Sequence, residues 1–273
     1  MKTVVAIYTG LALAEPLKAV FREQLPEARL VNIVDDSLIA DVIREGEVTP
    51  GVASRLEAYF REAEAMGADV ILNTCSSVRE VVDAAAERIG VPIVRIDEAM
   101  AREAVAAYAR IAVLATLPTT LAPTMRLLET EAAKLGKQVQ LVDGLAVGAF
   151  AALSEGRPEE HDRLLLETAL RAADEAEVIV LAQASMARME GALREATGKP
   201  VLSSPALGVA AVKAVLAQAA QGADGVGPGT AVDASTESGR TAGPGAQPGI
   251  DEDSSETSVA SETAQEQLGE AGR

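Results

Sequence analysis

Cys75 is the residue of this sequence whose type and position most clearly allow chemistry. It is the only cysteine, and it follows the predicted strand 70–73 and Thr74. An amphipathic stretch begins near Ser76, so Cys75 is predicted to lie at a helix N-terminus, where the pKa of a thiol is lowered. Arg79, one turn further on, adds to this effect if it points inward. The thiolate is then a candidate general base or nucleophile, although a free cysteine is often only a small buried residue.

Four turns of small polar residues follow the ends of predicted strands. They are Tyr8-Thr9-Gly10, Thr74-Cys75-Ser76-Ser77, Thr116-Leu117-Pro118-Thr119-Thr120 and Gln183-Ala184-Ser185. Backbone N–H groups and hydroxyls at such positions bind anions, so we expect a carboxylate ligand. The predicted substrate-binding residues are Tyr8, Thr9, Ser76, Ser77, Thr116, Thr119, Thr120, Ala184 and Ser185. Ser and Thr are also ordinary helix caps, so the prediction depends on the four turns converging.

Two other residues are candidates for a second proton-transfer group. His161 stands in Glu159–Asp162 at the start of a predicted helix, and its charged neighbours favour a position on the surface. Tyr8 reaches the site from the first strand or packs in the core. One cysteine and one histidine exclude a disulfide framework and the common structural zinc sites, so we expect no metal.

Strands that alternate with helices must position these residues. The expected strands are 4–8, 29–34, 70–73, 91–95, 111–115, 138–142, 178–182 and 201–203. Helical patterns between them include 52–66, 78–89, 123–135, 159–173 and 186–196. This alternation is typical of an α/β fold with mostly parallel sheets.

The two halves of the chain resemble each other. When residues 69–95 are placed over 177–203 without gaps, seven of 27 positions are identical, and Cys75 is paired with Gln183. Each segment reads as a strand, a small polar turn, a helix, Gly-x-Pro and a second strand. We therefore predict two pseudo-symmetric α/β lobes that arose by duplication, with a ligand cleft at the facing ends of their strands.

Composition divides the chain further and excludes some functions. Residues 221–273 contain ten acidic and two basic residues and few large apolar ones, so we expect a disordered acidic tail. The expected domains are 1–100 plus 204–220 for the first lobe and 101–203 for the second. The net charge of −17 argues against a nucleic-acid partner.

The N-terminal apolar run could also be read as a short signal peptide, but the repeat favours a buried first strand over residues 4–7. No apolar run reaches the roughly 20 residues that a membrane helix needs. We therefore expect a cytoplasmic protein without a membrane partner.

Several of these motifs occur together in one known family. They are the strand from Asp69 that leads into Cys75 and Ser77, the turn Ala115-Thr116-x-x-Thr119, the strand Val178–Leu181 and the closing segment Ser203–Ala206. In this order, over residues 1–217, the chain resembles the aspartate/glutamate/hydantoin racemase superfamily.

The resemblance implies a mechanism. Members of this family bind a small carboxylic acid between two lobes, and two cysteines transfer protons on opposite faces of the α-carbon without a cofactor. The resemblance also implies a homodimer or a higher homo-oligomer and a role in amino-acid metabolism. Here the first cysteine is Cys75, but Gln183 stands at the position of the second. An amide cannot accept a proton at neutral pH, although it can donate hydrogen bonds to an enolate.

Three functions remain open on this basis. The first is an isomerase (racemase or epimerase) of an amino acid, hydantoin or similar acid, in which Cys75 and Gln183 are catalytic and Tyr8, His161, Ser185 or a water acts on the second face. The second is a decarboxylase or other lyase with a single cysteine, and the third is a non-catalytic carboxylate-binding protein.

Overall fold

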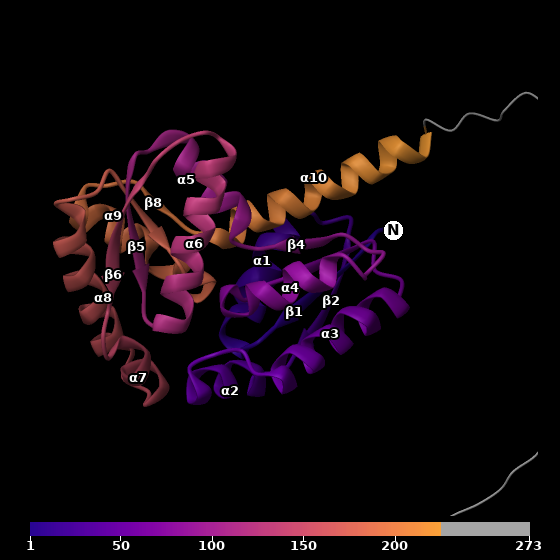
Figure 1. The fold of residues 1–273 in the computed structure, drawn as a ribbon, viewed down its shortest axis with the longest axis horizontal. Coiled ribbons are helices and arrows are strands. Elements are labelled where there is room, and N and C mark those ends of the chain that lie inside the picture. The colour runs from indigo at the N-terminus through magenta and orange to yellow at the C-terminus, as the bar shows by residue number, and fades with distance from the viewer. Residues whose placement is uncertain (225–273) are drawn as a thin grey trace, which may run out of the picture. The chain divides into compact units, whose positions relative to one another are not determined.

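The computed structural model describes residues 1–224, so most of the predicted acidic tail lies outside the described residues. Two four-stranded parallel sheets form the framework (Figure 1). The first contains β1 (Thr3–Tyr8), β2 (Arg29–Val34), β3 (Val70–Asn73) and β4 (Ile93–Arg95). The second contains β5 (Arg110–Ala115), β6 (Gln140–Leu145), β7 (Val178–Leu181) and β8 (Val201–Leu202).

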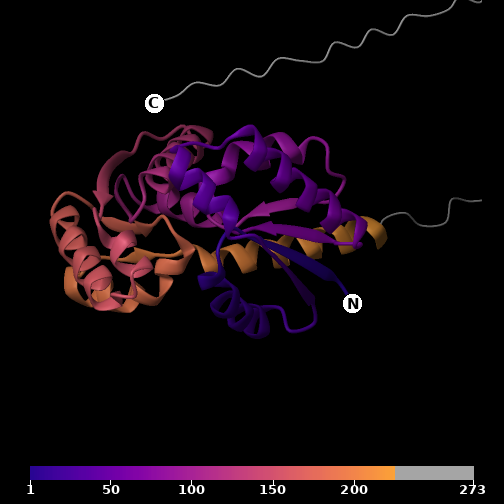
Figure 2. The ribbon, with the colours of Figure 1, turned by 90° about the horizontal axis from the view of Figure 1, so that it is seen from below.

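Helices cover both faces of each sheet, as Figures 1 and 2 show from two directions. Those of the first half are α1 (Ala14–Gln24), α2 (Ser37–Glu45), α3 (Pro50–Ala65), α4 (Arg79–Ala86) and α5 (Glu98–Ala107). Those of the second half are α6 (Pro118–Lys134), α7 (Ala149–Ser154), α8 (Pro158–Ala173), α9 (Glu190–Thr197) and α10 (Ser204–Asp224). The α/β class with two lobes is confirmed.

Both sheets have the same strand order. The order is β2-β1-β3-β4 in the first sheet and β6-β5-β7-β8 in the second, so each strand has a counterpart in the other half. This agreement supports the duplication predicted from the sequence. It also puts the ends of β3 and β7, which lead to Cys75 and Gln183, at equivalent places in the two lobes.

The strands are buried on both faces, which explains why they read as continuous apolar runs. In β1, Val5 and Ile7 pack with α2, α3 and α4 on one face, whereas Val4, Ala6 and Tyr8 pack with α1 and α10 on the other. The second sheet is built in the same way, between α5 and α6 on one face and α7, α8 and α9 on the other.

The C-terminal helix α10 belongs to the packing of the first sheet. Its residues Val209, Val212 and Leu216 join the core formed with α1 and β1, and Figure 1 shows α10 passing α1 and β4. A Cβ at Gly208 would lie 2.8 Å from the carbonyl oxygen of Ile96, so glycine permits the close approach. None of the helices in residues 1–224 is both long and apolar enough to cross a membrane.

The main differences from the predicted elements lie at helix starts. The helix expected over 78–89 is a 3₁₀ helix at Ser76–Val78 followed by α4, and the one expected over 186–196 is a 3₁₀ helix at Ala184–Met189 followed by α9. The helix expected from 123 begins five residues earlier, because Pro118 suits the first helical turn and Pro123 lies inside the helix. β6 begins two residues later than predicted and runs on to Leu145.

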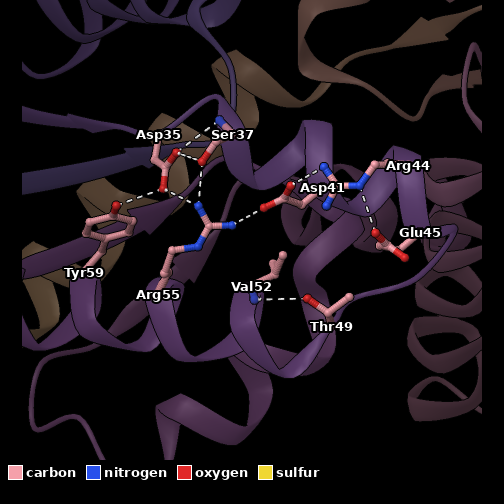
Figure 3. A network of polar contacts seen from close by, with 9 residues as sticks. All are labelled: Asp35, Ser37, Asp41, Arg44, Glu45, Thr49, Val52, Arg55 and Tyr59. Atoms are coloured by element: carbon pink, nitrogen blue, oxygen red, sulfur yellow. Dashed lines mark hydrogen bonds and ion pairs between the residues drawn. The ribbon is translucent and has the colours of Figure 1, made fainter. Parts of the chain in front are cut away.

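A polar network holds α2 against α3 (Figure 3). Asp35 accepts hydrogen bonds from Ser37 and from the Tyr59 hydroxyl, at 2.5 and 2.8 Å, and Arg55 donates to Ser37 at 2.6 Å. Burial alone would raise the pKa of Asp35, but these hydrogen bonds and the charge of Arg55 lower it overall. The network matters for function because α2 also carries Ile39, which lines the cavity described below.

We predict that Asp35→Asn lowers the free energy of unfolding at pH 7 by about 1–2 kcal/mol, since charged hydrogen bonds are lost. The pKa of Asp35 is lower in the folded than in the unfolded chain. Its contribution is therefore present above the unfolded value of about 3.9 and is lost as the pH falls through the folded value. Urea titrations at several pH values measure this, with exposed Asp36→Asn as the control. An equal loss in the two variants would contradict the prediction.

Candidate active site

The four predicted turns meet around one cavity of about 260 Å³. Each turn contributes to the wall, and so do η1 (Leu11–Leu13), α2, α7 and α8. The predicted residues that line the cavity are Thr9, Cys75, Ser76, Ser77, Thr116, Thr120, Gln183, Ala184 and Ser185. The carboxyl ends of β1, β3, β5 and β7 therefore deliver small polar groups from both sheets to a single space.

Two predicted residues lie elsewhere. The side chain of Tyr8 is fully buried on the face of the first sheet that α1 and α10 cover, and it does not line the cavity. Its hydroxyl donates to Asn32 Oδ1 at 3.1 Å. Because successive residues of a strand point to opposite faces, this position belongs to the core. Thr119 faces a neighbouring hollow of about 610 Å³ instead, and its hydroxyl is buried without a hydrogen-bond partner.

Hydrogen bonds between the two lobes form the floor of the cavity. The hydroxyls of Ser77 and Thr120 are 3.1 Å apart and buried. The Ser76 hydroxyl donates to the carbonyl of Ala182 at 3.4 Å. Both contacts are within two residues of Cys75 in sequence, so they hold the thiol against the second lobe.

Cys75 lies between the end of β3 and the 3₁₀ helix, partly exposed, with its backbone extended. Burial raises the pKa of its thiol, and hydrogen bonds with Thr9 and Ser77 offset only part of this effect. The negative charge of Asp97 raises the pKa further. The lowered thiol pKa expected from the sequence is therefore wrong, because desolvation outweighs the end of a short helix.

Arg79 does not reach the thiol either. It lines the neighbouring hollow, and its Nε is 3.6 Å from Asp83 Oδ2. Burial lowers the pKa of its guanidinium, and the charge of Arg95 lowers it further. Arg79 thus shapes the second hollow and not the cavity of Cys75.

Gln183 is held in one orientation. Its amide oxygen accepts hydrogen bonds from the backbone N–H of Thr116, at 2.7 Å, and from the Thr116 hydroxyl, at 2.9 Å. Two donors at this oxygen identify it as the carbonyl side of the amide. The NH₂ group is therefore the part of Gln183 that is available to a ligand.

Two ionisable residues near the site differ from what the sequence predicts. His161 is expected on the surface, but its side chain is buried and lines the cavity. Its spacing from Leu165, Thr168 and Ala172, which are all buried, is the signal that it lies on the inner face of α8. Asp97 belongs to no sequence motif. It follows the end of β4, the strand beside β3. Ligands of parallel sheets bind beyond the carboxyl ends of the strands, and this rule could have drawn attention to Asp97.

Asp97 is buried at the start of α5. Burial raises the pKa of its carboxyl, and the neighbouring Ser76 hydroxyl and the charge of Arg79 offset this only in part. Among the described residues, no Arg, Lys, Asp or Glu lines the cavity, and no group of three or more His, Cys, Asp or Glu side chains is placed to hold a metal ion.

Comparison with known proteins agrees with this architecture. The model of the Asp/Glu/Hydantoin racemase family matches residues 3–212. The chain belongs to this family. The resemblance inferred from the sequence is thus confirmed. No curated protein matches this racemase-family chain.

Solved structures of racemases share the fold. An allantoin racemase from Klebsiella pneumoniae is 20% identical, with a TM-score of 0.60 over 80% of this chain and 89% of that one. A glutamate racemase from Bacillus anthracis is 13% identical, with a TM-score of 0.61 over 80% and 82%. An arylmalonate decarboxylase is 15% identical, with a TM-score of 0.50 over 78% and 92%. At these identities the likeness concerns the fold.

We predict that Asp97→Asn makes Cys75 of this racemase-family protein more reactive, because a negative charge that raises the thiol pKa is removed. Alkylation by iodoacetamide should follow a pH profile displaced to lower pH, with a rate about threefold higher at pH 8. Because the chain has a single cysteine, the measured alkylation is that of Cys75. Asp174→Asn removes an exposed charge in the second lobe and is the matched control. Identical profiles for the two variants would contradict the role of Asp97.

Proposed function

We propose that the protein is a cofactor-independent isomerase, of racemase or epimerase type, that acts on a small carboxylic acid such as an amino acid or a hydantoin. The single observation that carries this proposal is the position of Cys75, the only thiol of the chain, in a cavity built by strand ends of both lobes. Membership of the racemase family supports the reaction class. Such substrates suit a cytoplasmic enzyme of amino-acid metabolism.

Neutral donors would bind the substrate carboxylate. Thr9, Ser76, Thr116, Thr120 and Ser185 line the cavity together with the starts of two 3₁₀ helices. The Ser76 and Thr116 hydroxyls donate to Ala182 and Gln183 in this structure, so these two would bind a carboxylate only by exchanging partners. Hydroxyls and free backbone N–H groups at such turns hold a carboxylate without a cationic side chain. Because no Arg or Lys of residues 1–224 lines the cavity, these donors carry the recognition.

Cys75 would transfer the proton. In the reaction, the thiolate takes the α-proton, and the electron pair of the C–H bond moves into the carboxylate or carbonyl system to form an enolate. Formation of the thiolate costs free energy because burial raises the thiol pKa, so its hydrogen bonds with Thr9 and Ser77 are part of the catalytic apparatus. The Gln183 NH₂ group would donate to the enolate oxygen, held in place by Thr116.

A single-cysteine decarboxylase is the second candidate. One thiol suffices for it, because loss of CO₂ leaves a carbanion that needs a single proton. Part of the cavity wall is apolar, with Phe150, Leu153 and Met186, and such a wall would favour departure of a carboxylate. The fold shared with an arylmalonate decarboxylase is consistent with this reaction. A non-catalytic carboxylate-binding protein is the remaining alternative.

Solvent deuterium exchange followed by proton NMR tests these functions. The protein is incubated in D₂O with aspartate, glutamate, hydantoins, malonates, maleate and hydroxy acids. We expect loss of the α-proton signal together with inversion for at least one compound. Cys75→Ala should abolish inversion, because no other thiol is present, while its circular dichroism and melting temperature stay close to those of the wild type.

Each other result points to a different function. Full turnover by Cys75→Ala would contradict the proposed role of the thiol. Release of CO₂ from a malonate would establish the lyase instead. If Cys75→Ser and the wild type bind a panel compound equally and neither exchanges or converts it, the protein is a binding protein.

A further inference from the structure

His161 occupies an unusual position for a histidine with charged neighbours in sequence. It lies in the first turns of α8, and only 3% of its surface is exposed. Glu159 and Arg163, on either side of it in sequence, are exposed, whereas His161 lies on the same helix face as buried Leu165. The imidazole is thus turned inward, toward the second sheet on which α8 packs.

This inward position brings His161 to the wall of the cavity that contains Cys75. The two residues come from different lobes, since Cys75 follows β3 of the first sheet and α8 packs on the second. Of the described residues that line the cavity, Cys75 and His161 are the two with ionisable side chains. A reaction that needs proton transfer on two sides of a carbon has these two groups at its disposal.

Neighbouring charges fix the orientation of the imidazole. Its Nδ1 is 2.7 Å from Asp162 Oδ1 and 3.2 Å from Arg188 Nη2. Arg188 is always a donor and already pairs with Asp162, with Nη1 at 2.8 Å from Oδ2. We assign the shorter contact as a hydrogen bond from Nδ1–H to Asp162. Nε2 is then the nitrogen with a free lone pair, as in other carboxylate-oriented catalytic histidines.

We propose that His161 is the second proton-transfer residue of this site and that it acts through Nε2 on the substrate face opposite Cys75, with Asp162 as its positioning residue. The inference rests on the proposed isomerase function and supplies the acid–base group that Gln183 cannot provide. A thiol and an imidazole replace the pair of thiols that a symmetric site would have.

The proton balance of the reaction is simple. In one direction the Cys75 thiolate takes the α-proton, the C–H electron pair enters the enolate, and the imidazolium of His161 gives its Nε2 proton to the other face. The products are the inverted acid, a neutral thiol and a neutral imidazole. For the opposite enantiomer the imidazole removes the proton and the thiol donates one, so the two directions restore each other.

The first test uses the enantiomers separately in D₂O, with the compound that the wild type converts. We expect His161→Asn to lower racemisation at least about 100-fold. His161→Asn should still exchange the α-proton of the enantiomer whose α-proton points toward Cys75, but not that of the other enantiomer. Cys75→Ala should exchange only the enantiomer whose α-proton points toward His161. Asparagine can keep a hydrogen bond to Asp162, so stability should change little. Racemisation by His161→Asn at the wild-type rate would overturn the proposal.

The second test does not depend on turnover. The chain has one cysteine and one histidine, so a reagent on Cys75 and the imidazole signals of His161 are each unambiguous. Iodoacetate attaches a carboxylate to Cys75, and iodoacetamide attaches a neutral amide of the same size. If Nε2 faces the thiol, the NMR titration of the imidazole should have its midpoint about one pH unit higher in the first adduct than in the second. Asp162 and Arg188 are present in both adducts, so their effects cancel.

The two tests separate two kinds of failure. Equal midpoints in the two adducts would overturn the placement of His161 whatever the protein catalyses. A raised midpoint with no exchange of any compound by the wild type would support the placement and overturn the proposed function.

Discussion

The hydrogen bond between the hydroxyls of Ser77 and Thr120 is the contact on which the rest of the site depends. It joins the two lobes at a buried point, where a lone hydroxyl would cost free energy if its partner moved away. Cys75 precedes Ser77 by two residues, and Thr116, which holds Gln183, precedes Thr120 by four. Neutral hydrogen bonds between the two lobes therefore help to hold Cys75 and Gln183 in their relative positions.

Among the described residues, no Arg, Lys, Asp or Glu lines the site, in a protein whose net charge is −17. The charged pairs lie outside it, such as Arg188 with Asp162 behind His161 and Arg55 with Asp35 on the outer helices. A carboxylate that enters is thus not held by a fixed positive charge, and protons can be placed on two groups without competition from other titrating side chains in the wall. Such a site favours chemistry in which protons move and the total charge stays constant.

Much of this arrangement can be predicted from the sequence, because parallel strands buried on both faces read as apolar runs and their ends can be located. The internal repeat by itself pairs Cys75 with Gln183. His161 is misjudged from sequence because its charged neighbours hide its helical spacing from Leu165. The sequence predicts a lowered pKa for the Cys75 thiol, whereas the structure raises it, because desolvation depends on packing from segments that are distant in sequence. Asp97 escapes notice for the same reason, since its proximity to Cys75 depends on the pairing of β4 with β3.

Gln183 has one more consequence, which concerns oxidation. A cleft with a thiol on each side can close into an internal disulfide, which would shut the site until a reductant opens it. This chain has a single cysteine, and the equivalent position of the other lobe, which lines the same cavity, is Gln183. Oxidised Cys75 therefore has no resolving partner within its own chain, and a sulfenic acid formed there can be recovered only by an external thiol.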